Sequence, residues 1–238
     1  MILNNIKFLA NGRIHIENYD NPWNNRNLWH SGLNIDFIKK ACNNDINNIV
    51  EFGSYDGGDG IRYKYHFPSA NVYSIEASPF CYAKMKPLEE YGIKIFNYAI
   101  SNKCGKALFH GTYDENLDNY APCGSLNKNY CSTPQPAGNV PLKIMPPIEV
   151  PCVTLEAFCS EQKINFIDLL HIDVEGHAVE VISGFGNVRP KLIYIEVSSD
   201  THDHSLEVGQ LLTSMNFKKV AAAFHDEIWV DNEYLHLE

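Results

Sequence analysis

The sequence of 238 residues lacks several features that would assign it directly to a class of protein. No apolar run approaches the about 20 residues that a membrane span requires, so no span is predicted. The chain has 19 Lys and Arg residues against 29 Asp and Glu residues, a net charge of -10, and it lacks clusters of cations. Phosphate backbones and anionic membranes need such clusters, so nucleic acid is not expected as a partner. The first ten residues have no cleavable apolar core, so no signal peptide is predicted.

The cysteines also lack a diagnostic pattern. There are seven, an odd number, and none forms a CxxC pair. Such a pattern fits reduced thiols in the cytoplasm better than a disulfide framework or a zinc site. The 45% hydrophobic and 20% charged residues predict one globular domain with a sizeable core, or a domain with a cap.

A glycine-rich turn follows the first strongly apolar strand. The strand at 49–52 contains Glu51, and glycines follow at positions 53, 57, 58 and 60. Glycine permits positive φ and lets a ligand approach the backbone, while amides of the next segment can face an anion. A second apolar strand ends in Glu76, about 20 residues beyond the turn, as expected of a carboxylate that binds a ribose diol. The turn predicts a nucleotide-like ligand, with an ordinary loop as the alternative.

Apolar strands and helices alternate along most of the chain. Helices are expected at 35–42, at 79–91 with a kink at Pro87, and on apolar stripes that include Val181 and Val208. The expected parallel strands are 49–52, 71–76, 93–100, 166–173 and 191–197. The last two strands, 217–224 and 227–230, are too close for a helical crossover and must form a hairpin. This pattern predicts a Rossmann-like α/β three-layer sandwich with a C-terminal antiparallel hairpin and ligands at the carboxyl ends of the strands.

Two segments fall outside this alternation. Residues 1–45 are expected to form an irregular N-terminal arm followed by a helix. Trp29, His30 and Ser31 either close over the ligand or plug the bottom of the sheet, and plugging is favoured. Residues 111–150 contain many glycines and prolines, so they predict a long irregular loop, with a substrate lid favoured over a passive excursion. Three tyrosines of this loop, Tyr113, Tyr120 and Tyr130, have faces that could stack on sugars or rings.

A second polar cluster interrupts the strand at 166–173. His171, Asp173 and Glu175 occupy alternate positions, which places them on one face near the carboxyl end. Asp173 is expected to face the ligand cleft. For Glu175 the favoured interpretation is different, namely a cap on a helix that starts there.

These motifs resemble the FkbM-type family of S-adenosylmethionine-dependent methyltransferases, whose members have a class I methyltransferase sheet. Matching segments occur in the family's order over residues 46–232, which is therefore the predicted methyltransferase domain. They are Glu51-Phe52-Gly53, Ile75-Glu76-Ala77-Ser78-Pro79, Ala99-Ile100-Ser101, Gly124-Ser125-Leu126, Val153-Thr154-Leu155, His171-Ile172-Asp173-Val174-Glu175-Gly176 and Ile195-Glu196-Val197. The chain departs from the family at His171, where a lysine is usual, and at His177-Ala178, where one acid is missing.

The resemblance implies methyl transfer from S-adenosylmethionine to a small-molecule or glycan acceptor, most often a hydroxyl of a sugar or natural-product scaffold. Glu51 would lie near the methionine ammonium, and Glu76 would accept hydrogen bonds from the ribose hydroxyls. The other residues expected at the cofactor are Gly53, Ser54, Gly57, Ala77, Ala99 and Ile100.

An acceptor hydroxyl is a weak acid, so a base within hydrogen-bond reach is expected. The candidates are His171, Asp173, His202 and His204, with a histidine held by Asp173 or Glu196 as the favoured arrangement. A divalent metal that acidifies the hydroxyl is a less favoured hypothesis. Its candidate ligands are Asp173, Glu175, Glu196, His202, Asp203 and His204.

Two other functions stay open at this point. A catalytically silent module could retain the fold and the cofactor site, as the departures at His171 and Ala178 allow. A nicotinamide-dependent oxidoreductase would share the glycine turn and the distal acid, but the glycines here do not follow the GxGxxG spacing.

Overall fold

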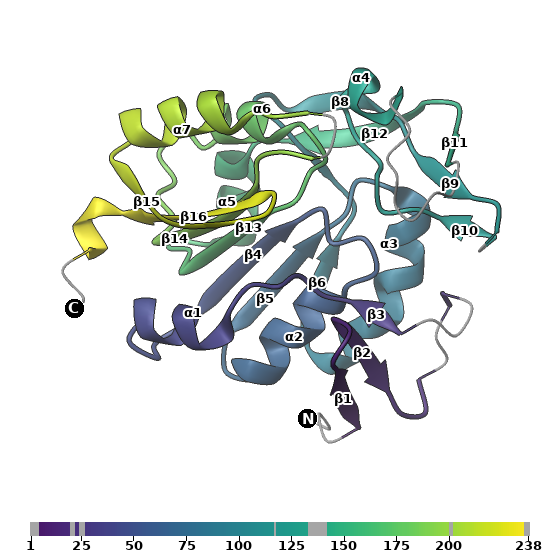
Figure 1. Ribbon diagram of the computed structural model, residues 1–238, viewed down its shortest axis with the longest axis horizontal. Helices are drawn as coiled ribbons and strands as arrows, with labels where there is room; N and C mark the ends of the chain where they lie inside the picture. The colour runs from purple at the N-terminus through teal and green to yellow at the C-terminus, as the bar shows by residue number, and fades with distance from the viewer. Residues whose placement is uncertain are drawn as a thin grey trace.

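The computed structural model describes residues 5–19, 22–23, 27–116, 118–132, 142–199 and 202–235. Its centre is a seven-stranded sheet with the order β15-β16-β14-β13-β4-β5-β6 (Figure 1). These strands are β4 (Asn48–Phe52), β5 (Asn71–Ile75), β6 (Ile93–Phe96), β13 (Leu169–Ile172), β14 (Leu192–Glu196), β15 (Phe217–Ala223) and β16 (Asp226–Asp231). Strand β16 is antiparallel to both of its neighbours, whereas the other neighbouring pairs are parallel. The predicted α/β sandwich with a terminal hairpin is confirmed.

Alternate side chains of the central strands enter two separate cores. Ile49 and Leu169 pack with the helices of one face, whereas Val50 and Leu170 pack with those of the other. The first face carries α1 (Ile35–Ala41), α2 (Gly58–His66), α3 (Pro79–Met85) and the 3-10 helix η1 (Lys86–Tyr91). The second carries α5 (Leu155–Gln162), α6 (Ala178–Ser183) and α7 (Ser205–Ser214). A strand that is apolar on both faces thus gives the three layers seen in Figure 1.

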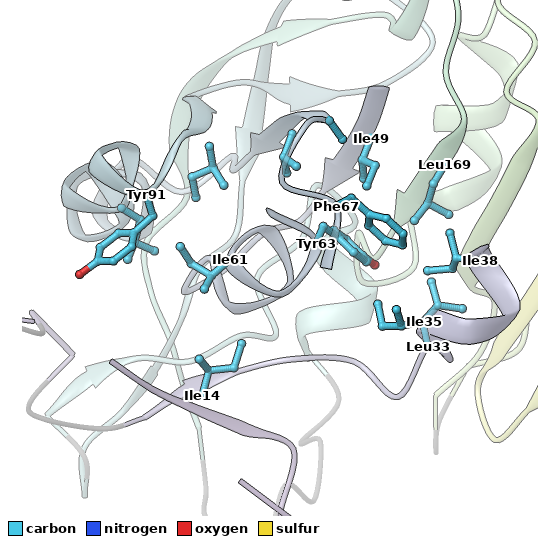
Figure 2. Packing of buried hydrophobic residues seen from close by; sticks show 14 of the residues in the cluster. Ile14, Leu33, Ile35, Ile38, Ile49, Ile61, Tyr63, Phe67, Tyr91 and Leu169 are labelled. Atoms are coloured by element: carbon cyan, nitrogen blue, oxygen red, sulfur yellow. The ribbon is translucent and has the colours of Figure 1, made fainter. Parts of the chain in front are cut away.

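The N-terminal segment is more regular than predicted. Strands β1 (Ile6–Leu9) and β2 (Arg13–Ile16) form an antiparallel hairpin, and β3 (Leu28–Trp29) pairs with β2. This small sheet packs on α2, and Figure 2 shows Ile14 of β2 on one side of that helix and Ile49 of β4 on the other. The prediction of an irregular arm was therefore wrong.

The predicted strand at 93–100 is divided between two sheets. Strand β6 ends at Phe96, and β7 (Ala99–Ile100) pairs instead with β12 (Ile148–Val153), which also pairs with β8 (Gly105–Phe109). The Asn97 amide explains the division, because its Nδ2 donates to the carbonyl oxygens of Glu76 at 2.8 Å and Ala77 at 3.1 Å. These bonds hold the chain beside the turn after β5, so that β7 leaves the main sheet.

Residues 111–150 contain regular elements that the sequence did not predict. Strand β9 (Thr112–Asp114) pairs with β10 (Asn119–Tyr120) and β11 (Lys143–Ile144), and α4 (Lys128–Ser132) lies between β10 and β11 along the chain. Prolines 134, 136 and 141, on which the prediction of an irregular loop also relied, lie outside the described residues. The role of the segment as a lid stays a prediction. Within the described ranges, no helix is both long and apolar enough to cross a membrane.

Candidate active site

A cavity of about 510 Å³ opens where β4, β5 and β13 reach their carboxyl ends. This is where an open parallel sheet binds its ligands. Seven of the predicted cofactor residues line it: Glu51, Gly53, Ser54, Glu76, Ala77, Ala99 and Ile100. The predicted base candidates His171 and Asp173 line it too. One cavity therefore collects residues that lie more than 100 positions apart in the sequence.

The structure explains why two positions of the turn are glycine. Gly53 has a φ of 80°, and a Cβ there would lie 1.6 Å from the Asp173 carbonyl oxygen. Only glycine therefore lets the ends of β4 and β13 approach so closely. Gly57 also has a φ of 80°, but a Cβ on it would meet Leu88 of η1 at 2.6 Å. Gly57 does not line the cavity, so the structure gives it a packing role beside α2 in place of the predicted cofactor contact.

The two aspartates of the turn hold the N-terminal sheet. Asp56 accepts a hydrogen bond from the Trp29 backbone N–H at 2.8 Å. Asp59 accepts from the Ser31 N–H at 2.7 Å and from the Ser31 hydroxyl at 2.9 Å. Trp29 and Ser31 thereby line the ligand cavity. The favoured prediction, that this stretch plugs the opposite end of the sheet, was wrong.

Glu76 is a buried carboxylate held in place by backbone amides. Its Oε2 accepts from the Tyr55 N–H at 2.9 Å, and its Oε1 accepts from the Ser78 N–H at 2.7 Å. Burial raises the pKa of Glu76 to about 7. Each carboxylate oxygen has a further lone pair, so the ionised group can still accept two bonds from a diol in the cavity.

Glu51 is buried beside a second acid. Its Oε2 accepts a hydrogen bond from the Ser74 hydroxyl at 2.7 Å. Burial, together with the negative charge of Asp59, raises the pKa of Glu51 to about 8. A positively charged ligand group at this end of the cavity would favour its ionised form.

His171 is buried among aromatic side chains. Its Nδ1 lies 3.0 Å from the Tyr63 hydroxyl, and its ring lies 4.8 Å from the ring of Tyr194. Burial lowers the pKa of His171, so the imidazole is held in its neutral form. One carboxylate oxygen each of Glu51 and Asp59 lies within 4.8 Å of a His171 ring nitrogen. A lysine at this position, as is usual in the family, would bring a positive charge close to these two acids.

Asp173, Glu175 and Glu196 form a cluster of carboxylates beside the cavity. One carboxylate oxygen of each lies within 4.8 Å of the other two. Glu175 has a φ of 51° and precedes α6, whose first residue is Ala178. The favoured interpretation of Glu175 as a cap on a helix starting there was therefore wrong.

The remaining predicted histidines lie outside the main cavity. His202 packs on Tyr130 with the ring centroids 4.9 Å apart, and His204 lines a separate cavity of about 10 Å³ together with Glu196. Neither lines the large cavity, and neither joins the cluster of carboxylates. Their catalytic role stays a prediction without geometric support.

Several residues that the sequence analysis did not place in the site line the cavity, and His177 and Arg13 are the basic ones among them. His177 lines the cavity, and its Nε2 lies 2.9 Å from the Ser101 hydroxyl. In the sequence it stood out only as a departure from the family pattern. Arg13 comes from β2, and its guanidinium carbon lies 4.7 Å from the centre of the Trp29 ring. Seven acidic residues line the cavity: Glu51, Asp56, Asp59, Glu76, Asp114, Asp173 and Glu175. Among the described lining residues Arg13 is the one lysine or arginine.

The strand order and the glycine turn at the carboxyl end of β4 are those of the Rossmann-like sheet of class I methyltransferases. The sequence matches the Methyltransferase FkbM domain over residues 51–219, and the chain belongs to this family. The predicted family is thereby confirmed.

Individual relatives were found by sequence and by structure. The chain is 31% identical over 172 residues to the 2-O-methyltransferase NoeI of Sinorhizobium fredii (strain NBRC 101917 / NGR234). That match covers 68% of this chain and 66% of the relative, slightly less than two thirds of its length. Precorrin-6y C5,15-methyltransferase of Geobacter metallireducens GS-15 matches with 9% identity and a TM-score of 0.43, over 81% of this chain and 82% of that one. The SAH-bound methyltransferase PaMTH1 of Podospora anserina matches with 11% identity and a TM-score of 0.41, over 81% and 74%.

Proposed function

We propose that this protein transfers the methyl group of S-adenosylmethionine to a hydroxyl oxygen of a sugar. The observation that carries the proposal is the buried Glu76 carboxylate directly after β5, which lines the same cavity as Asp173. We assign the ribose of the cofactor to Glu76 and the acceptor to the part of the wall that carries Asp173. The name of the relative NoeI, a 2-O-methyltransferase, supports oxygen as the methylated atom.

In this proposal the cofactor lies across the ends of β4 and β5. Glu76 accepts hydrogen bonds from both ribose hydroxyls, and Glu51 faces the methionine ammonium. Ala99 and Ile100 of β7 flank the adenine. Gly53 leaves room for the ligand at the backbone. These assignments use the chemistry of each group and its place on the cavity wall.

The aromatic groups at the cavity support a sugar as the acceptor. Trp29 lines the cavity and is 49% exposed, and Tyr120 lines it too, with its ring stacked on Phe80 at a centroid distance of 4.4 Å. Flat, partly exposed aromatic faces bind the apolar faces of sugar rings. Tyr130, predicted as a third stacking group, is buried and does not line the cavity. A natural-product scaffold with a hydroxyl is the broader class to which this acceptor belongs.

The methyl group on the sulfonium of S-adenosylmethionine is already activated, so the protein mainly has to align the acceptor and remove its proton. The acceptor oxygen attacks the methyl carbon as the bond to sulfur breaks, and S-adenosylhomocysteine leaves. Alignment of the acceptor supplies several kcal/mol of the barrier. A base that removes the hydroxyl proton contributes about 10²- to 10⁴-fold. We place that base at Asp173 or His171, since these two of the four predicted candidates line the cavity.

We also propose a class of acceptor and a cellular location. A small-molecule or glycan acceptor fits the acidic cavity, which has little to offer a phosphate backbone. The cytoplasm is the proposed location, because the six cysteines with described side chains are all free and the total is odd.

Calorimetric titration tests the cofactor first. S-adenosylmethionine and NAD are titrated separately into the wild type and into Glu76→Ala. We expect micromolar binding of S-adenosylmethionine, its loss in the variant and no binding of NAD. Binding of NAD alone would favour the oxidoreductase and contradict the proposal.

A panel of sugars and hydroxylated scaffolds then tests methyl transfer with radiolabelled cofactor. We expect label in at least one sugar. Cofactor binding without transfer to any acceptor would favour the silent module.

A further inference from the structure

Three carboxylates at the cavity have no positively charged partner in the part of the chain that the structure describes. Asp173 follows β13 directly, Glu196 ends β14, and Glu175 lies in the loop before α6. One carboxylate oxygen of each lies within 4.8 Å of the other two, so that their negative charges repel one another. Among the described residues, no lysine, arginine or histidine forms an ion pair with any of the three. The cluster therefore suits a bound cation.

A buried tyrosine hydroxyl makes an independent second observation. Tyr130 of α4 is 1% exposed, and its hydroxyl has no hydrogen-bond partner of normal geometry. The negative charges of Glu175 and Glu196 act on this hydroxyl, which places it beside the cluster. The hydroxyl thus lies beside the acidic groups but makes no hydrogen bond of normal geometry to them, which is costly at a buried position.

The chain around this tyrosine is built to hold it there. A Cβ on Gly176, which has a φ of 79°, would lie 2.2 Å from Tyr130 Cδ2, so only glycine leaves room for the ring. The Ser125 hydroxyl donates to the Glu175 carbonyl oxygen at 2.6 Å, and Asn127 Nδ2 donates to the Gly176 carbonyl oxygen at 3.4 Å. The segment 125–130 is thus fastened to the loop that carries Glu175.

We propose that Asp173, Glu175 and Glu196 bind one divalent cation, with the Tyr130 hydroxyl beside it. Ligands that are all oxygen suit Mg²⁺, Mn²⁺ or Ca²⁺ rather than a metal that prefers sulfur or imidazole. His202, a candidate ligand from the sequence, is not part of this set.

This inference rests on the proposed function, because Asp173 and Glu175 line the cavity in which the acceptor would lie. A cation there would bind the acceptor hydroxyl and lower its pKa. Because Asp173 would be a ligand of the cation, the hydroxyl proton would pass to His171 or to water. Glu196 does not line the large cavity, so it can be changed without removing a proposed cofactor contact.

Direct binding of Mn²⁺ tests the site without cofactor or acceptor. Mn²⁺ is titrated at pH 8 into the wild type, Glu196→Gln and Glu175→Gln, and free Mn²⁺ is followed by electron paramagnetic resonance. We expect one ion per wild-type chain and affinity about tenfold weaker or worse in both variants. Glu207→Gln, on an exposed position of α7, is the matched control and should bind like the wild type.

The outcomes separate the cation site from the function itself. Absence of Mn²⁺ binding to the wild type up to millimolar concentration, or equal binding by folded Glu196→Gln and Glu175→Gln, would overturn the site. S-adenosylmethionine is titrated into the same samples. Cofactor binding without Mn²⁺ binding refutes the cation alone, whereas Mn²⁺ binding without cofactor binding refutes the proposed function. Circular dichroism identifies any variant that does not fold. If a variant does not fold, titration of the wild type with Mn²⁺ still tests whether the site binds a cation.

Discussion

Glu76 shows how burial of one residue should make cofactor binding depend on pH. Its pKa is raised to about 7 by burial, so the free protein holds this carboxyl largely protonated below pH 7. Two ribose hydroxyls are best bound by the ionised group. Affinity for S-adenosylmethionine should therefore weaken as pH falls, by about tenfold between pH 8 and pH 6 if one proton competes.

Calorimetry at several pH values measures this dependence. Glu76→Gln should bind S-adenosylmethionine weakly and lack the tenfold change in affinity between pH 8 and pH 6. Any dependence on pH that the variant retains belongs to other groups, such as Glu51. A wild-type dissociation constant that stays flat from pH 6 to pH 8 would contradict the assignment of Glu76.

Gly53 offers a test of the close approach between β4 and β13. A Cβ there would meet the Asp173 carbonyl oxygen at 1.6 Å, so Gly53→Ala must displace backbone in addition to its cost at positive φ. We expect the free energy of unfolding to fall by about 3 kcal/mol or more. Gly12→Ala is the matched control, because Gly12 also has a positive φ but a Cβ would find ordinary contacts from 3.6 Å. It should cost about 1 kcal/mol.

Urea unfolding followed by circular dichroism gives both values. Equal losses in the two variants would show that the φ angle alone matters at Gly53, and that the strand ends can separate.

At the scale of elements, the N-terminal sheet should take part in cofactor binding although it precedes the matched family region. Arg13 of β2 lines a cavity rich in acids, and no ion pair joins it to a described residue. The methionine carboxylate is the anionic group of the proposed cofactor. Arg13→Ala should therefore raise the dissociation constant about tenfold, the loss of one charge-assisted hydrogen bond.

Lys40→Ala provides the comparison for Arg13→Ala. It removes an exposed cation from α1, away from the cavity wall, and should leave affinity unchanged. Equal affinity in Arg13→Ala and the wild type would exclude this residue from the cofactor site.

The elements differ in how far the sequence could predict them. Strands β4, β13 and β14 are apolar on both faces and bounded by polar turns, so their number and order along the chain were predictable. The hairpin of β1 and β2 was missed although Asn11-Gly12, a dipeptide typical of hairpins, lies between its strands. The division of the strand at 93–100 depends on two bonds made by Asn97 to a distant turn. No local pattern encodes such a contact.

The site was predictable where its residues end strands. Glu76 and Asp173 each directly follow a parallel strand, and that rule places them in one cleft. Arg13 and Tyr130 reach the site region through tertiary packing of segments whose own patterns say nothing about a ligand. The interpretation of Glu175 as a cap failed because its positive φ delays the helix to Ala178.

For the whole molecule, the cavity joins parts of the chain that otherwise pack in separate cores. Its wall includes the turn after β4, the end of β5, strand β7 of the smaller sheet and β3 of the N-terminal sheet. A ligand that contacts all four should stabilise the folded state as a unit. Binding to the folded state at 100 times the dissociation constant adds about 2.7 kcal/mol.

S-adenosylhomocysteine, which cannot react further, is the ligand to use for this test. For a chain of this size, 2.7 kcal/mol corresponds to a rise in Tm of about 5 to 10 °C. Differential scanning calorimetry should show this rise for the wild type, none with NAD, and none for Glu76→Ala at the same ligand concentration. A shift with NAD but not with S-adenosylhomocysteine would mean that the cavity takes a different nucleotide. If Glu76→Ala kept the full rise in Tm, the ribose would have to bind elsewhere on the cavity wall. Removal of the Glu76 carboxylate should weaken binding of S-adenosylhomocysteine if that carboxylate accepts hydrogen bonds from the ribose.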